Sequence, residues 1–375
     1  MKPTRRHVAS LAAIVTVTAG LLAGTGLLAG SASAGGFPAY VGPLHKVTTL
    51  ASTVPGNGDV NPYGVAVIPR STGDLWRGNV LVSNFNDKAN VQGTGTTIVE
   101  VTPSGKVGLF AQINRNLPGC PGGVGLTTAL TVLRSGWVIV GSLPTKNGNI
   151  SGPGCLIVLN QWGRVRETFA GGGINGPWDM ASLDLGNRAV LFVTNVLNGT
   201  VAANGGTVFG GTVLRLVIKI PRFGLPYIWF RTTIGSGFPQ RTDPAALVIG
   251  PTGVGLGPNG VLYVADTLVN RIAGIPNALR RHTSAGRGFT VSAGGHLNGQ
   301  LGLVIAPNGN ILTVNGGDGN LVEVTPFGFQ IAVRQLDSSG SPPGAGALFG
   351  LAVRPGRHRG VYFVDDATNT LNLLH

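Results

Sequence analysis

Six polar residues recur at one position of a repeated pattern, each at the end of a short apolar run. They are Asn84, Ser142, Asn195, Asp266, Asn315 and Asp365, and Asp87, Asp318 and Asp366 lie just beyond three of these runs. Carboxylate and amide oxygens gathered in this way could hold a calcium ion. Asn and Asp at strand ends also cap turns by accepting hydrogen bonds from nearby backbone N–H groups. We favour turn capping and predict no cofactor, with calcium as the alternative.

Aromatic and acidic residues stand where the same repeated units begin. Tyr63, Trp178 and Phe349 suit stacking on a sugar or a peptide, and they could equally plug the mouth of a channel. Asp179 occupies a position at which four of the other five units have glycine. No residue is assigned a catalytic role. The predicted ligand-binding set is Tyr63, Asn84, Asp87, Trp178, Asp179, Asn195, Asp266, Asn315 and Asp365.

The chain has two cysteines, Cys120 and Cys155. Both fall in one repeated unit, before its first apolar run and at the start of its third, which places them on the same side of the unit. In an exported protein such a pair favours a disulfide, which would stabilise the fold by on the order of 3–4 kcal/mol. A nucleophilic cysteine would need a neighbouring base and an electropositive setting, for which the sequence offers no candidate.

The elements that carry these residues repeat along the chain. Six units begin near residues 63, 128, 178, 252, 301 and 349, and three of the five intervals are close to 50 residues. Each unit contains short Val-, Ile- and Leu-rich runs separated by Gly, Pro and Asn, which is typical of short strands and tight turns. A period near 50 residues with about four strands per unit is typical of propeller blades. The sequence therefore predicts an all-β, six-bladed β-propeller with four-stranded antiparallel blades.

The two ends of the chain complete one another. The last unit stops at His375 after three runs, one strand short of a blade, and the segment 45–53 has the pattern of an outer strand. Pairing this N-terminal strand with the last blade would close the ring and remove an exposed sheet edge.

The recurring pattern G-[LV]-x-[VL]-x-P-x-G-x-[LV]-[YF]-V-[AD]-D-x-x-x-N resembles NHL-repeat proteins, most clearly in the last three units, and the likeness covers residues 45–375. This resemblance implies a six-bladed propeller but little about chemistry, because propellers carry lyases, lactonases and binding modules. Propellers similar to regucalcin and gluconolactonase hold a metal through residues at the strand entrances. Here those positions hold residues that are not metal ligands: Tyr63, Thr128, Trp178, Thr252, Leu301 and Phe349.

Similar amidating lyases use histidine-bound zinc. After residue 34 the histidines are His45, His282, His296, His358 and His375, which fall at unequal places in their units. Zinc ligands must converge within about 2 Å of one ion, so a shared zinc site is not expected.

The N-terminus resembles an export signal. Lys2, Arg5 and Arg6 precede an uncharged stretch that ends in the small-x-small sequence 32–34, the order found in cleaved signal peptides. A permanent anchor is the alternative, since the stretch is long enough to span a bilayer. We predict a signal peptide over 1–34, a short lead over 35–44, one propeller domain over 45–375 and a secreted or extracytoplasmic location. Removing 1–34 lowers the formal net charge from +13 to +10.

Loop lengths suggest where a partner binds. The second-to-third connections are long in the first three units (83–97, 142–154 and 195–211) and short in the others, and long loops on rigid scaffolds often carry binding sites. We expect a monomeric, non-enzymatic binder of a carbohydrate, a peptide or a protein partner.

The scattered basic residues do not form the stripe typical of nucleic-acid proteins, and no stable membrane insertion is expected after removal of 1–34. The alternative is a metal-dependent lyase or lactonase-like hydrolase acting on a sugar or polysaccharide, using Asp179 with Asn84, Asn195, Asp266 or Asp365.

Overall fold

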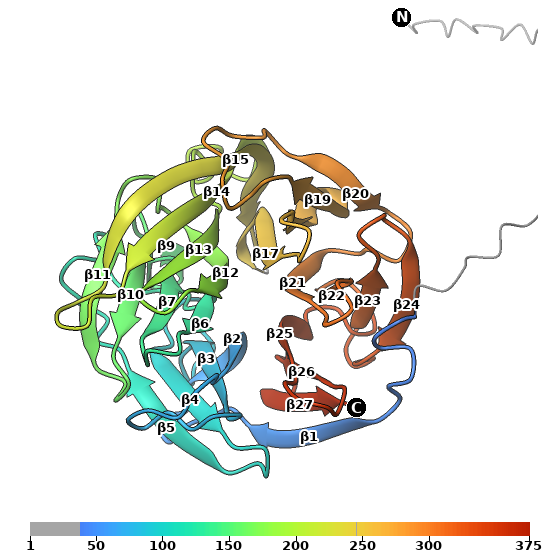
Figure 1. The fold of residues 1–375 in the computed structure, drawn as a ribbon, viewed down its shortest axis with the longest axis horizontal. Coiled ribbons are helices and arrows are strands. Elements are labelled where there is room, and N and C mark those ends of the chain that lie inside the picture. Colours follow the sequence, from blue (N-terminus) through green and yellow to red (C-terminus); the bar gives the residue numbers. More distant parts are fainter. Residues whose placement is uncertain (1–37, 245) are drawn as a thin grey trace, which may run out of the picture. The chain divides into compact units, whose positions relative to one another are not determined.

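The computed structural model describes residues 38–375 except Ala245, and the predicted signal peptide lies outside this range. Short Val-, Ile- and Leu-rich segments form six sheets arranged in a ring (Figure 1). The predicted six-bladed β-propeller is therefore confirmed. Among the described residues, no helix is long and apolar enough to cross a membrane.

Each blade contains four antiparallel strands, and we call them first to fourth from the ring axis outward. The first three blades are β2 (Val60–Val67), β3 (Val80–Asn86), β4 (Thr97–Val101) and β5 (Val107–Gln112); β6 (Leu130–Val132), β7 (Val138–Ser142), β10 (Cys155–Leu159) and β11 (Val165–Ala170); and β12 (Pro177–Asp184), β13 (Arg188–Asn195), β14 (Val208–Lys219) and β15 (Tyr227–Asp243), extended by β16 (Leu247–Ile249). A small hairpin, β8 (Thr145–Lys146) and β9 (Asn149–Ile150), stands in the long loop of blade 2.

The last three blades have the same order. They are β17 (Pro251–Leu256), β18 (Leu262–Asp266), β19 (Arg271–Ile275) and β20 (Phe289–Ala293); β21 (Gln300–Ile305), β22 (Ile311–Asn315), β23 (Asn320–Val324) and β24 (Gln330–Gln335); and β25 (Leu348–Val353), β26 (Val361–Asp365), β27 (Thr370–Leu374) and β1 (Val47–Ser52). A 3₁₀ turn, Thr267–Val269, follows β18.

The N-terminal strand closes the ring as expected. Strand β1 pairs antiparallel with β27, from Val47 opposite Leu374 to Ser52 opposite Thr370. The backbone N–H of His375 donates to the carbonyl of Lys46 at 2.8 Å. This pairing covers an edge of β27 that would otherwise present unpaired backbone groups to solvent.

Part of the segment predicted as a short lead, residues 35–44, packs against the propeller. Tyr40, Val41 and Leu44 are buried in the apolar cluster between blades 5 and 6. The backbone N–H groups of Tyr40 and Val41 donate to the two carboxylate oxygens of Glu323 at 2.7 and 2.8 Å. Glu323 also accepts from the Asn310 amide at 2.6 Å and is fully buried. The sequence did not reveal this contact, because nothing in the sequence around Glu323 distinguishes a buried carboxylate from an exposed one.

Crowding at the axis explains part of the glycine content. A Cβ on Gly64 would lie 2.7 Å from the Cβ of Leu130 in the next blade, and one on Gly350 would lie 1.8 Å from the carbonyl oxygen of Tyr63. Neighbouring blades therefore approach so closely that no other residue fits at these two points.

The predicted disulfide is present. Cys120 and Cys155 are bonded, with their Cα atoms 5.3 Å apart. The bond ties the loop that enters blade 2 to the first residue of β10 on the loop-rich face.

Removing the Glu323 carboxylate tests how the N-terminal segment is held. Glu323→Ala should lower the free energy of unfolding by about 3 kcal/mol or more, because three buried donors lose their acceptor. Chemical denaturation measures this, and proteolysis should cut the variant sooner within residues 38–46. Glu167→Ala, which removes a carboxylate that accepts from the neighbouring Thr168 N–H, should stay within about 0.5 kcal/mol of the wild type. Equal stability of both variants would contradict this role of Glu323.

Candidate functional site

The innermost strands of the six blades enclose a channel of about 460 Å³ along the ring axis. These strands (β2, β6, β12, β17, β21 and β25) pair with a neighbour on one edge only, so the backbone groups of the other edge face the axis. The side chains that line the channel between these backbone groups are mostly apolar. They include Val65, Val132, Leu183, Leu256 and Val353. The channel thus offers apolar walls with backbone donors and acceptors between them, and its volume suits a small molecule.

An aromatic cluster closes the channel at the loop-rich face. Tyr63 and Trp178 are 1% and 2% exposed, and the Trp178 indole N–H donates to the Tyr63 hydroxyl at 2.9 Å. The ring of Phe349 lies 5.4 Å from that of Tyr63 and 5.9 Å from that of Phe85, measured between centroids. Of the two roles expected for these residues, stacking on a ligand or plugging the channel, the burial of Tyr63 and Trp178 supports the plug.

Asp179 lines the channel beside this plug. It is the only acidic or basic residue among those that line the channel. Its Oδ1 accepts the backbone N–H of Met180 at 2.7 Å, and its own N–H donates to the Thr194 hydroxyl. The side chain has intermediate exposure because it faces the channel, although protein surrounds it.

Burial raises the pKa of Asp179 from its ordinary value of 3.8 to about 7. Backbone N–H groups of Met180 and Val254 lower the pKa but do not cancel the effect of burial. Burial and, next, the charge of Asp179 raise the pKa of Tyr63 well above 10.0, while the bond from Trp178 lowers it. At neutral pH the channel therefore holds a carboxyl group that can give or take a proton, next to a phenol that keeps its own.

The channel opens at the opposite face, where the first-to-second turns lie. Pro69 at the end of the first inner strand is exposed, and Leu183, Leu256 and Ile305 at the same level are partly exposed. The predicted functional face was the loop-rich one. The channel does not open there, because large aromatic side chains occupy the strand entrances.

The polar ring predicted from the strand ends is present but does not face solvent. Asn84, Ser142, Asn195, Asp266 and Asn315 are fully buried, and Asp365 is 6% exposed. Most bond to nearby backbone groups: Asn84 donates to the carbonyl of Thr53, Asn195 accepts from Asn175 N–H, and Asp365 accepts from Thr368 N–H. These bonds connect the strand ends to the loops, and they do not direct the six side chains toward one ion.

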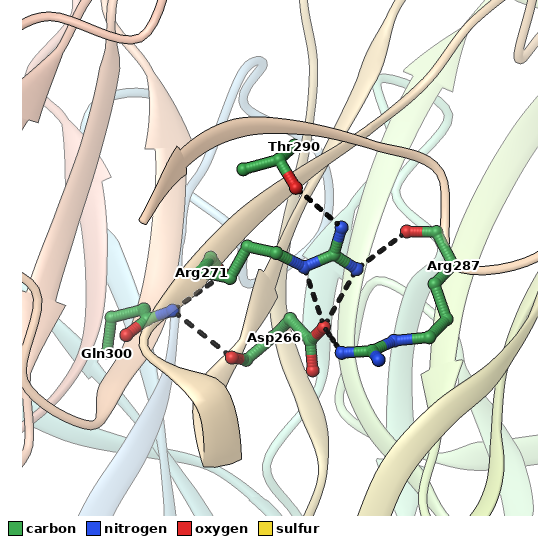
Figure 2. A network of polar contacts seen from close by, with 5 residues as sticks. All are labelled: Asp266, Arg271, Arg287, Thr290 and Gln300. Carbon is green, nitrogen blue, oxygen red and sulfur yellow. Dashed lines mark hydrogen bonds and ion pairs between the residues drawn. The ribbon is translucent and has the colours of Figure 1, made fainter. Parts of the chain in front are cut away.

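Asp266 is the buried acid of an ion-pair network with two arginines (Figure 2). Its Oδ2 accepts from both Nε and Nη2 of Arg271, at 3.0 and 2.8 Å, and from Arg287 at 2.9 Å. Arg271 also donates to the Thr290 hydroxyl, and the Gln300 amide donates to the Arg271 carbonyl at 2.7 Å. The network joins the second, third and fourth strands of blade 4 to the start of blade 5, so Asp266 has a structural role.

Two further acids lie on the loop-rich face. Asp87 lines a groove of about 690 Å³ between blades 1 and 2, with Arg115 and Lys146. In blade 6, burial and the neighbouring charge of Asp365 raise the pKa of Asp366 to about 7. Asp366 accepts from the Asn61 amide at 3.2 Å and does not line the axial channel.

The residues of the channel do not fit a calcium ion. Calcium takes six to eight oxygen ligands, usually with several carboxylates, and Asp179 is the only carboxylate there. Within residues 38–375, leaving out Ala245, no three or more His, Cys, Asp and Glu side chains are grouped as a metal site would need. The metal set of a regucalcin-like propeller is therefore not reproduced at the strand entrances.

Comparison with known proteins supports the fold. No family model matches the chain, and no curated protein matches it. A gluconolactonase from Xanthomonas campestris is similar in structure, with a TM-score of 0.54 and 12% identity over 87% of this chain and 88% of that one. A PQQ-bound aldose sugar dehydrogenase from Streptomyces coelicolor gives 0.53 and 15% over 88% and 98%. Regucalcin from Agrobacterium tumefaciens gives 0.50 and 14% over 86% and 92%.

At these identities the likeness extends to the six-bladed propeller and no further. Membership of the NHL-repeat family stays a prediction, although the blades that suggested it are present. The sequence signal for the channel was Asp179, the one acid at a position otherwise occupied mainly by glycine.

The raised pKa of Asp179 predicts a stability change with pH. Between about pH 4 and 7 the folded protein holds a proton that the unfolded chain has released, so this residue's contribution to stability falls as pH rises through that window. Asp179→Asn should match the wild type near pH 4 and exceed it at pH 8 by about 1–3 kcal/mol. Denaturant titrations at several pH values measure the difference. A difference that does not change with pH would show that Asp179 has an ordinary pKa.

Proposed function

We propose that the protein is an enzyme that acts on a small uncharged molecule in the axial channel, as a hydrolase or lyase of the lactonase type. The observation that carries the proposal is Asp179, a single carboxyl group with a pKa of about 7 in a channel of suitable volume. Titratable groups tuned to neutral pH inside a cavity are typical of proton-transfer sites.

The chemistry follows from two side chains. About half of the Asp179 carboxyl groups are ionised at pH 7, and the ionised form would take a proton from a water molecule or from a substrate carbon. Tyr63 accepts a hydrogen bond from Trp178, so its hydroxyl can donate a hydrogen bond, without losing its proton, to a substrate oxygen that becomes negative. For a lactone, the activated water would add to the carbonyl carbon, and the ring C–O bond would then break as the proton held by Asp179 passes to the leaving oxygen.

The similar solved structures are consistent with a reaction of this kind. They include a gluconolactonase and an aldose sugar dehydrogenase, so propellers of this shape host reactions on small sugar-derived molecules. The disulfide supports the extracytoplasmic location predicted from the N-terminus. Here the pocket is entered from the turn side and has one carboxylate, so the proposal uses no bound metal.

A lactone panel with pH-dependent rates tests this function. Glucono-1,5-lactone and a series of alkyl lactones should include a compound that the wild type hydrolyses, with kcat/KM rising as pH increases through about 7. Asp179→Asn should lower kcat/KM by roughly 10²–10⁴-fold, the usual contribution of a general base. Acid release followed with a pH indicator measures the rate.

Asp366→Asn is the matched control, because Asp366 has a pKa of about 7 but lies outside the channel. This variant should keep the wild-type rate. If no lactone reacts faster than in buffer, or if both variants lose activity equally, the proposal is wrong.

A second candidate function is binding of a carbohydrate or peptide at the loop-rich face. The groove between blades 1 and 2 favours it, because Arg115, Lys146 and Asp87 place charges of both signs along one depression. On a glycan and peptide array, Lys146→Ala should then lose the signals of the wild type by at least fivefold while Asp179→Asn keeps them. If the wild type binds nothing on the array, this second function is wrong.

A further inference from the structure

The face onto which the axial channel opens consists of turns, and we call it the turn face. It carries the connections from first to second and from third to fourth strands, which antiparallel pairing places at one end of every blade. Its segments are 68–79, 102–106, 133–137, 160–164, 185–187, 220–226, 257–261, 276–288, 306–310, 325–329 and 354–360.

These turns are strongly basic. Arginine or lysine occurs in the turns of every blade except blade 5, and a single turn of blade 6 contains Arg354, Arg357 and Arg359. Asp74 is the only acidic residue in these segments, all of which the structure describes. The loops of the opposite face hold Asp59, Asp87, Asp318, Asp337 and Asp366, with Lys88, Arg115 and Lys146 as their basic residues. The positive charge of the protein is therefore concentrated on the turn face.

Large aromatic side chains stand out of the same turns. Trp76 in blade 1 is 64% exposed, Trp162 in blade 2 is 51%, Phe223 in blade 3 is 84% and Phe327 in blade 5 is 71%. Arg222 lies beside Phe223, with its guanidinium carbon 5.5 Å from the ring centroid. Leaving four such rings in water is unfavourable for an isolated soluble protein, and exposed apolar groups of this size mark contact surfaces.

We propose that the turn face docks on the surface of a lipid bilayer that contains anionic lipids. Aromatic rings prefer the interfacial region of a bilayer, and basic residues are attracted to anionic head groups. The four rings stand on turns of four different blades and are therefore spread over the turn face, which suits a flat surface better than a chain-like polymer lying in one groove. The fold places rings and charges together without inserting any strand into the membrane.

This inference does not depend on the proposed reaction, but it adds a consequence. The mouth of the channel would face the bilayer, so molecules dissolved in the interfacial region could enter without crossing bulk water.

Vesicle binding tests the docking surface. The probe is vesicles of 70% phosphatidylcholine and 30% phosphatidylglycerol, compared with pure phosphatidylcholine, in a co-sedimentation assay. The assay uses residues 35–375, because residues 38–375 form a compact unit by themselves and the apolar stretch 8–30 would bind lipid on its own. The protein should bind the anionic vesicles in preference, and binding should weaken as salt is raised from 50 to 300 mM.

Two sets of variants separate the aromatic from the electrostatic contribution. Phe223→Ser with Trp76→Ser should weaken binding at least tenfold. Replacing Arg354, Arg357 and Arg359 with Gln should weaken it by about fivefold for each charge removed. Phe209→Ser is the matched control, because Phe209 is 66% exposed but lies at the end of β14 that adjoins the loop-rich face, and it should bind as the wild type does.

Two results would overturn the proposal. One is failure of the wild type to bind the anionic vesicles at 50 mM salt while its circular dichroism shows a folded protein. The other is that heparin retains the protein as well as the anionic vesicles do, and that Phe223→Ser with Trp76→Ser changes neither result. The surface would then be a binding site for soluble polyanions.

Discussion

Crowding of six sheets around one axis is the constraint on which the rest of this structure depends. A four-stranded blade has two apolar faces and can bury both only between two neighbours. Packing six of them in a ring brings the innermost strands together, and at Gly64 and Gly350 the approach leaves no space for a Cβ. The same convergence leaves a narrow channel whose walls are the free edges of those strands.

The channel gives its one carboxyl group an unusual environment. An acid on the outer surface would be hydrated, but Asp179 is placed where apolar walls and the Tyr63–Trp178–Phe349 cluster surround it. Burial therefore dominates the effect of its backbone hydrogen bonds and keeps its pKa close to 7. The acids at the strand ends are buried too, but Asp266 is neutralised by Arg271 and Arg287. Asp179 and Asp266 thus differ in chemistry because only Asp266 has cationic partners.

The architecture could be read from the sequence because it depends on period, turn residues and the incomplete last unit, all of which are local patterns. The disulfide followed from there being two cysteines in one blade. The site was harder to foresee. Strand ends marked Asn84 and Asn315 as polar positions, but their orientation into the loops depends on packing between blades. The closure of one end of the channel depends on Tyr63, Trp178 and Phe349, which are 115 and 171 residues apart in sequence and meet only in the finished ring. The anchoring of Tyr40 and Val41 by Glu323 likewise joins segments that no local pattern relates.

The pairing of β1 with β27 also constrains when the molecule can become complete. The strand made first must wait for the strand made last, so the nascent chain cannot finish folding until its final residues are released. Until then β1 has no partner strand, and the apolar residues around Tyr40 lack the part of their cover that blade 6 supplies. Closure of the ring is therefore the last step in the assembly of this fold.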